Sequence, residues 1–210
     1  MKWKTVDGLL RADAVRYGDL LETMRGYTGD RKVKWINRRA ALLRQPLRAR
    51  AEGNFASGRP RYRIDQDPLG RSWYVNTPNR LYLYQNGIAH RAIDLAHSYA
   101  LQHVEFRPGD VVIDCGANYG DLGLYFHVMD APVPVRYLAV EPGEEEAECI
   151  SLNLPGAEAE TFAMALGRED SRATFFYAPD STGGRSALSP WPDETIVEKY
   201  DVTVTTLDSL

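Results

Sequence analysis

The sequence predicts an α/β fold built on a parallel sheet. After residue 105, short apolar segments alternate with helical ones, and the first apolar segment, residues 111–115, ends in a glycine-rich turn. Alternation of strands and helices specifies a parallel sheet with right-handed crossovers. The apolar run predicts a strand that is buried on both faces, and a partly buried helix is expected from Asp121 onward.

The first sixty residues predict two helices followed by a linker. Apolar residues recur at helical intervals over 9–24 and again over 33–43. Asp30 can cap the second helix, and Pro46 bends or ends it. Residues 48–60 contain two glycines and a proline, and we interpret them as a linker.

A hairpin and a third helix are expected to lead into the parallel sheet. The β-rich segments 61–65 and 71–75 flank a turn sequence that contains proline and glycine, which is typical of a hairpin. Asn79 or Gly87 then precedes a helical stretch that reaches Leu101.

The segments after residue 135 at first continue the alternation of strands and helices, and the last two predicted strands depart from it. Residues 136–140 predict the second strand of the sheet, and residues 159–163 predict the third. Between them, the acidic run 144–148 suits the positive end of a helix dipole, and we interpret it as a solvated helix start. Residues 173–177 and 202–205 are expected to form two antiparallel partners.

Length and composition favour one domain with an appendage. The chain has 210 residues, of which 44% are hydrophobic. We divide it into a basic helical N-terminal extension (1–60), a hairpin and helix leading into the core (61–104), and the core (105–210). The two cysteines, Cys115 and Cys149, are interpreted as buried small apolar residues, because their number and spacing suit neither a disulfide framework nor a metal site.

The first residues contain no continuous apolar segment. The sequence therefore predicts neither a signal peptide nor a membrane span, and it favours a cytoplasmic location.

The net charge of −4 conceals a strong asymmetry. Residues 1–100 hold 19 Lys and Arg against 9 Asp and Glu, whereas residues 101–210 hold 6 against 20. Either the two halves attract one another, or the basic half meets an anionic substrate, lipid or nucleic acid. We favour the first account and expect no nucleic-acid partner, because no nucleic-acid motif accompanies the basic residues.

The glycine loop after residue 115 has the character of a nucleotide-type cofactor loop. Gly116 and Gly120 allow a sharp turn and a close approach of the backbone to a ligand, but Asn118 stands where a dinucleotide fingerprint needs its second glycine. Glu141 ends the next predicted strand, 21 residues after Gly120, where an acid accepts hydrogen bonds from ribose hydroxyls. NAD and S-adenosylmethionine both carry such a ribose; the loop favours S-adenosylmethionine.

The ordered set of motifs from residue 81 to the C-terminus resembles the FkbM family of S-adenosylmethionine-dependent methyltransferases. Besides the glycine loop, the resemblance rests on Tyr84-Gln85-Asn86-Gly87-Ile88 with Arg91, Phe106-Arg107-Pro108-Gly109-Asp110, Ala139-Val140-Glu141-Pro142, Ser151-Leu152-Asn153-Leu154, Ala163-Met164-Ala165-Leu166-Gly167 and Val204-Thr205-Thr206-Leu207-Asp208-Ser209-Leu210.

The resemblance implies a Rossmann-like class I methyltransferase sheet and methylation of a hydroxyl group on a sugar, another glycan or a secondary metabolite. It implies S-adenosylmethionine as the cofactor, held by Asp114, Gly116, Ala117, Asn118, Gly120, Glu141, Pro142, Ala163 and Met164. The sequence identifies no general base and no metal-binding constellation.

Several of these residues have a second interpretation. In the resemblance Asp114 fixes the glycine loop and helps to fix the methionine amino group, which is the interpretation we favour; the alternative is that it only caps the loop by accepting backbone N–H groups. Asn118 either contacts the methionine carboxylate or only adopts a left-handed conformation, and Glu141 either binds the ribose or caps a helix. Ala163 and Met164 would lie beside the adenine or in the core.

In the family, the segment that matches Leu207-Asp208 is followed by further strands and helices, and here nothing follows Leu210. We therefore expect an incomplete sheet with an N-terminal helical and hairpin extension, and self-association or a partner chain that completes it. The alternatives are a non-catalytic cofactor-binding or partner module and an NAD-dependent oxidoreductase.

Overall fold

The computed structural model describes residues 29–42, 44, 47–66, 70–128, 133–156, 159–178, 185–187, 196 and 198–210. The helix predicted over residues 9–24 lies outside this part of the chain. The described residues form a mixed α/β structure with three separate sheets.

The N-terminal part consists of a helix packed on a three-stranded antiparallel sheet. The elements are α2 (Gly29–Leu42), β1 (Leu47–Asn54), β2 (Pro60–Gln66) and β3 (Arg71–Val75). The predicted hairpin is confirmed as β2 and β3, which pair antiparallel. The predicted linker is wrong, because β1 pairs with β2 across it. Leu47 and Ala49 are buried and alternate with exposed arginines, but alanine marks this alternation only weakly in a sequence.

Two short helical turns and one helix connect this sheet to the next. They are η2 (Pro78–Tyr84), α3 (Ile88–Ser98) and η3 (Leu101–His103). Of the two predicted starts of the helix, Gly87 is the N-cap of α3. Its φ of 114° lies in the region that favours glycine.

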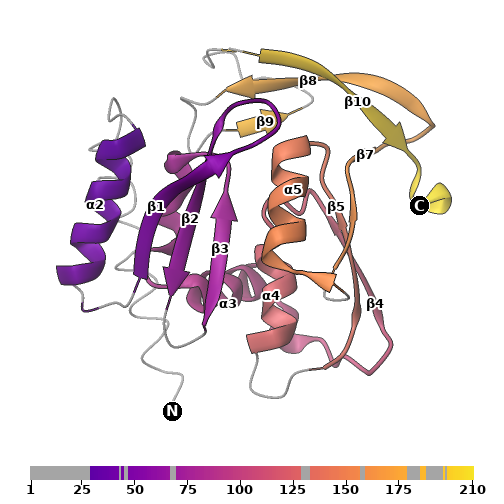
Figure 1. Cartoon of the computed structure of the whole chain (residues 1–210). Helices are drawn as coiled ribbons and strands as arrows, with labels where there is room; N and C mark the ends of the chain where they lie inside the picture. The colour runs from indigo at the N-terminus through magenta and orange to yellow at the C-terminus, as the bar shows by residue number, and fades with distance from the viewer. Residues whose placement is uncertain are drawn as a thin grey trace.

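The second sheet is parallel, as predicted, with the strand order β4-β5-β6. The strands are β4 (Val111–Cys115), β5 (Arg136–Val140) and β6 (Glu160–Phe162), and the intervening helices are α4 (Asp121–Val128) and α5 (Glu144–Asn153). In Figure 1, α4 and α5 lie between this sheet and the N-terminal sheet, so the layers run helix, sheet, helices, sheet.

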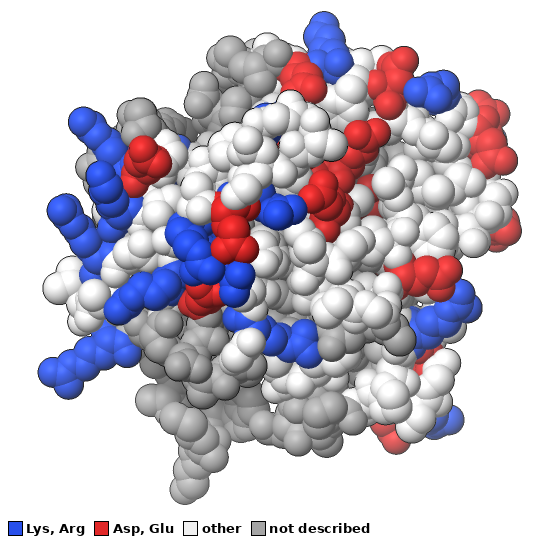
Figure 2. Space-filling view, in the orientation of Figure 1, with Lys and Arg blue, Asp and Glu red and all other residues white. Residues whose placement is uncertain are grey.

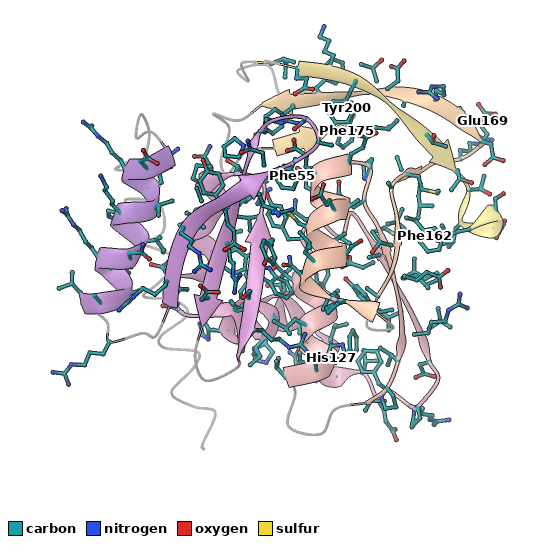
Figure 3. All side chains as sticks on the ribbon, in the orientation of Figure 1. Phe55, His127, Phe162, Glu169, Phe175 and Tyr200 are labelled. Atoms are coloured by element: carbon teal, nitrogen blue, oxygen red, sulfur yellow. The ribbon has the colours of Figure 1, made fainter. Side chains whose placement is uncertain are left out.

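The third sheet lies across the end of α5 and β5 in Figure 1. Its order is β7-β10-β8-β9, and its strands are β7 (Ala165–Leu166), β8 (Ser171–Ala178), β9 (Arg185–Ala187) and β10 (Glu198–Thr205), followed by η5 (Leu207–Ser209). The predicted antiparallel pair is confirmed as β8 and β10. Phe175 and Tyr200, labelled in Figure 3, meet edge to face with ring centroids 5.7 Å apart in a small second core.

The two faces of the parallel sheet differ in cover. Tyr137 and Ala139 are buried on the face toward the helices. On the opposite face, which we call the open face at β4, Val111 is 52% exposed and Ile113 is 39% exposed, and Cys115 is exposed as well, whereas Leu138 and Val140 of the neighbouring β5 are buried. The prediction that residues 111–115 are buried on both faces is therefore wrong, because β4 is an edge strand with only one face covered.

One hydrophobic core joins the N-terminal elements to the covered face of the parallel sheet. It contains Ile36 of α2, Ile64 and Trp73 of the antiparallel sheet, and Leu124 and Ile150 of α4 and α5. The N-terminal part thus contributes directly to the core on which the parallel sheet rests.

The opposite charges of the two halves meet in several ion pairs. Arg59 lies 2.7 Å from Glu145, and Arg91 lies 3.2 Å from Asp121. These pairs support the account in which the halves attract one another. Other basic side chains gather over α2 on the face drawn in Figure 2, with an acidic side chain beside them. No helix in the described part of the chain is long and apolar enough to cross a membrane.

Candidate functional site

The glycine loop turns the chain across the carboxyl end of β5. Gly116, Asn118 and Gly120 all have positive φ angles, of 83°, 53° and 79°. The N–H groups of Gly116 and Ala117 both donate to the carbonyl of Val140, at 2.8 and 3.1 Å. The loop is therefore fixed to the second strand before α4 begins, and Asn118 does adopt the left-handed conformation that is one of its two interpretations.

Glu141 connects the glycine loop with the start of α5. Its carboxylate accepts the N–H of Asn118 through Oε2 and the N–H of Gly143 through Oε1, both at 2.9 Å. Burial, followed by repulsion from Glu146, raises the pKa of Glu141 to about 7, although both N–H donors favour the charged form. A carboxylate has about four acceptor sites, so these two bonds leave capacity for a further hydroxyl donor.

Asp114 lies on the other side of the sheet from the open face. Its carboxylate accepts a hydrogen bond from the Tyr137 hydroxyl. Burial raises the pKa of Asp114. Among the described residues this carboxylate makes no hydrogen bond to the loop backbone, and Asp114 is not part of the wall of the cavity at the glycine loop described below. Its part in ligand binding stays a prediction.

A cavity of about 230 Å³ opens beside the glycine loop, at the carboxyl ends of β4 and β5. It is lined by Cys115, Gly116, Val140, Pro142, Met164, Ala165, Leu166 and Phe175. A Cβ built on Gly116 would meet nothing within 4 Å, so the backbone there borders empty space. Crevices at the carboxyl ends of parallel strands are the usual ligand sites of open α/β sheets.

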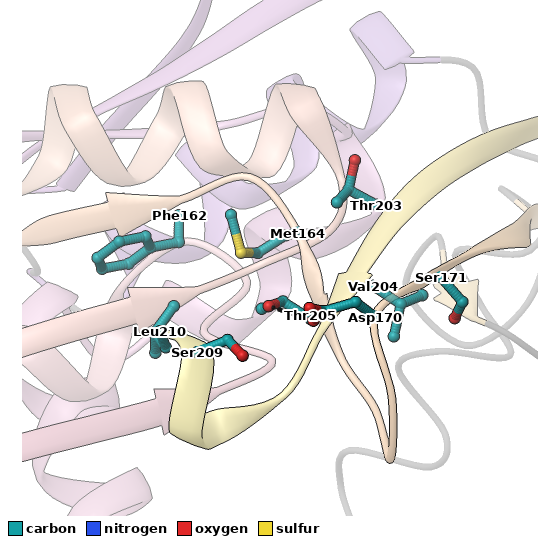
Figure 4. Close-up of a pocket in the computed structure, with 9 residues that line it drawn as sticks. All are labelled: Phe162, Met164, Asp170, Ser171, Thr203, Val204, Thr205, Ser209 and Leu210. Atoms are coloured by element: carbon teal, nitrogen blue, oxygen red, sulfur yellow. Dashed lines mark hydrogen bonds between the residues drawn. The ribbon is translucent and has the colours of Figure 1, made fainter.

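A second hollow, of about 280 Å³, shares Met164 with this cavity. Figure 4 shows its lining residues, which are Phe162, Met164, Asp170, Ser171, Thr203, Val204, Thr205, Ser209 and Leu210. Asp170 accepts the hydroxyl of Thr205 at 2.9 Å and the N–H of Thr206 at 3.2 Å. The wall therefore mixes hydroxyl and carboxylate groups with apolar side chains, a composition that suits a ligand with several hydroxyls.

Three of the nine predicted cofactor residues, Gly116, Pro142 and Met164, line the first cavity. The other six are not part of its wall. Ala117 is buried, and Gly120 is packed so closely that a Cβ would lie 2.9 Å from Leu154, so their roles in the structure are to shape the loop. Ala163, before Met164, is exposed.

Sequence reasoning missed much of the cavity wall. Phe175 comes from β8, which no local pattern connects with the glycine loop. Cys115 was expected to be buried, but it is exposed at the cavity because it lies on the open face; Cys149 is buried as predicted. Side chains alternate between the two faces of a strand, so Cys115 lies on the same face as Val111 and Ile113. With the edge position of β4 known, this alternation would have predicted that Cys115 is exposed.

The start of α4 is anchored by a buried polar network. Asp121 is 5% exposed and accepts the Trp73 indole N–H at 3.0 Å and the Tyr84 hydroxyl at 2.8 Å. Arg91 adds its ion pair to the other carboxylate oxygen. The residues that hold the first turn of α4 therefore come from β3, η2 and α3.

A second network anchors the middle of the loop. The Tyr119 hydroxyl donates to Asn76, and the Asn153 amide donates to the carbonyl of Tyr119 at 2.9 Å. Asn153 also exchanges two hydrogen bonds with the backbone of Tyr74. Both networks hold the glycine loop against the N-terminal sheet. Tyr84, Arg91 and Asn153 lie in motifs that the sequence analysis singled out, but the motifs did not indicate these contacts.

The interpretation of the acidic run as a solvated helix start is wrong. Glu145 and Glu146 are 7% and 4% exposed. Arg59, which stacks 4.8 Å from the Tyr177 ring centroid, pairs with Glu145 and with Glu198 at 2.8 Å. These two glutamates are buried because the hairpin and the third sheet cover this side of the start of α5, which local sequence does not reveal, whereas Glu144 is exposed.

Comparison of the chain with protein-family models, curated proteins and solved structures finds no match. Within the described residues, no group of three or more His, Cys, Asp or Glu side chains is placed to hold a metal ion.

Proposed function

We propose that the chain binds S-adenosylmethionine at the carboxyl ends of β4 and β5 and transfers its methyl group to a hydroxyl of a sugar, another glycan or a secondary metabolite. The observation that supports this proposal most is the cavity itself. Its walls are apolar, and it lies beside a left-handed glycine loop at the edge where open α/β sheets bind ligands; the buried acid Glu141 is outside the wall but bonds to the same loop.

The residues present fit such a cofactor. The empty space beside Gly116 allows a ligand to approach the backbone, and the apolar side chains of Met164 and Phe175 suit the faces of a purine. Glu141 has acceptor capacity for ribose hydroxyls next to the same loop. The hydroxyl-lined hollow that shares Met164 is our candidate site for the acceptor.

When bound, S-adenosylmethionine supplies an electrophilic methyl group for an in-line displacement. The task of the chain is to hold the two reactants in line and to exclude water, which converts an encounter of two molecules into an oriented step. We assign no general base. Asp170 faces the candidate acceptor hollow, where its carboxylate can orient an acceptor hydroxyl.

Calorimetric titration with S-adenosylhomocysteine tests the proposal. We expect binding to the wild-type chain, and a loss of about 1.5–3 kcal/mol in Glu141→Ala, the range of a hydrogen bond to a charged group. Glu144→Ala is the matched control, because Glu144 is an exposed acid at the same helix start. Equal affinity of a folded Glu141→Ala variant would exclude the ribose assignment, and binding of NAD(H) instead would favour the oxidoreductase.

The open face of β4 favours a second candidate, a cofactor-binding module without catalysis. A parallel sheet is normally covered on both faces, and here Val111 and Ile113 are exposed on one of them. A methyl-transfer assay with a panel of polyol acceptors separates the two functions. Cofactor binding without transfer would support the module.

A further inference from the structure

The solvent-facing side of α2 carries a stripe of basic side chains. The helix packs on the N-terminal sheet through Ile36 and Ala40, which are both buried. At 3.6 residues per turn, the opposite side of the helix holds Arg31, Lys34 and Arg38, and all three are exposed.

Two more exposed arginines, Arg44 and Arg48, follow the helix, but Arg48 lies in β1, where its cross-strand neighbour is Asp65. We therefore call only the three cations of the helix, Arg31, Lys34 and Arg38, the basic face of α2; Asp30, in the first turn of the helix, is an exposed acid. None of these three cations forms an ion pair with another described residue, whereas Arg50, Arg59, Arg61, Arg63 and Arg91 all pair with carboxylates. Within the part of the chain that the structure describes, the attraction between the two halves therefore does not involve these charges.

The position of the basic face suits a partner that is an extended surface. In Figure 1, α2 lies at the edge of the molecule, and in Figure 2 its Lys and Arg side chains project outward from that edge. Guanidinium groups bind phosphate oxygens in pairs, so a surface rich in phosphates is the complementary partner.

The side chain of Leu42 distinguishes between two phosphate-rich partners. It stands at the C-terminal end of the stripe and is 84% exposed. A bilayer interface accepts such an apolar side chain next to basic ones, whereas a nucleic-acid backbone offers it no apolar contact. In addition, the amide side chain of Asn37 in α2 exchanges hydrogen bonds of 2.8 and 2.7 Å with the backbone of Ala49. It is therefore not free to form hydrogen bonds with a nucleic-acid base.

We propose that the basic face of α2 docks on an anionic phospholipid surface, with Leu42 entering the interface beside the headgroups. This inference does not depend on the proposed methyl transfer. The chain as a whole carries a charge of −4, so attachment is local and depends on the orientation of α2 toward the bilayer. The attachment weakens as salt screens the headgroups.

Sedimentation with vesicles tests the proposal on the full chain. We expect binding to phosphatidylcholine vesicles that contain about 30% phosphatidylglycerol, little binding to phosphatidylcholine alone, and release as salt rises from roughly 50 to 500 mM. Charge reversal in the triple variant R31E/K34E/R38E should lower the partition coefficient by about 100-fold or more, because each basic residue near the bilayer contributes separately.

The triple variant R107E/R168E/R172E is the matched control. It changes the net charge equally and replaces three exposed arginines outside α2, so its partition coefficient should change less than about threefold. Leu42→Ser should weaken binding several-fold and leave the salt dependence in place. Circular dichroism establishes that each variant is folded.

Three outcomes would overturn the proposal. The first is an equal loss of vesicle binding in the two triple variants. The second is that the folded wild-type chain does not bind anionic vesicles at low salt. The third is binding to duplex DNA that is tighter than vesicle binding at equal phosphate concentration and is lost in R31E/K34E/R38E. The last result would assign the basic face of α2 to nucleic acid.

Discussion

The two faces of the parallel sheet differ in how deeply their side chains are buried. On the face toward α4 and α5, Tyr137 is 3% exposed and Ala139 is fully buried, and the core continues through the helices to the N-terminal sheet. On the open face, Val111 and Ile113 of β4 face solvent. The difference is confined to β4, because Leu138 and Val140 of β5 lie on the same side as Ile113 and Cys115 and are 7% and 1% exposed. The edge strand is therefore the part of the sheet that is accessible to ligands or partners, whereas the main core lies on the covered face.

The largest expected effect is the loss of the network on the covered face. Asp121→Ala removes the acceptor of Trp73, Tyr84 and Arg91 and leaves a partly buried cation without its partner. We expect a loss of about 3–5 kcal/mol in the free energy of unfolding, measured by urea denaturation. Asp121→Asn keeps one oxygen acceptor and should lose less. A loss below about 1 kcal/mol for Asp121→Ala would show that the network contributes little to stability.

The next prediction concerns Glu141, at the edge where the two faces meet. Its pKa is raised from 4.5 to about 7, so the folded state binds the proton more tightly than the unfolded state. The contribution of this carboxyl group to the free energy of unfolding is therefore largest below pH 4.5. It falls by about 3 kcal/mol as the pH rises to 7.

Glu141→Gln should lack this fall. Other buried acids titrate over the same range, so the quantity to compare is the difference in unfolding free energy between wild type and variant at each pH. A difference that is constant from pH 4.5 to 7 would contradict the raised pKa.

The smallest expected effect is on the open face. Ile113→Ser should change the free energy of unfolding by no more than about 0.5 kcal/mol, because the side chain is already partly solvated. It should also reduce the self-association that an exposed apolar face promotes, which sedimentation velocity can measure. Ala139→Ser, a polar substitution on the covered face, is the comparison and should cost about 1–3 kcal/mol. Similar costs for both variants would mean that the two faces do not differ in burial.

Local patterns in the sequence were sufficient for most elements of the parallel sheet. The apolar run of β4, the glycines after it and the strand before Glu141 predicted the order strand, loop, helix, strand. The same reasoning failed for β1, because its inward positions are small alanines and its glycine resembles those of a loop. It also failed for Glu145 and Glu146, because their cover comes from segments that are distant in the chain.

The sequence by itself determined the backbone geometry of the candidate site. Glycines at 116 and 120 permit positive φ, and an acid placed directly after the second strand reaches the loop. Only the tertiary structure decided which side chains line the cavity and which face of the sheet is open. Phe175 and Trp73 take their places through packing between segments far apart in the chain, and contacts of that kind leave no periodicity in the local sequence.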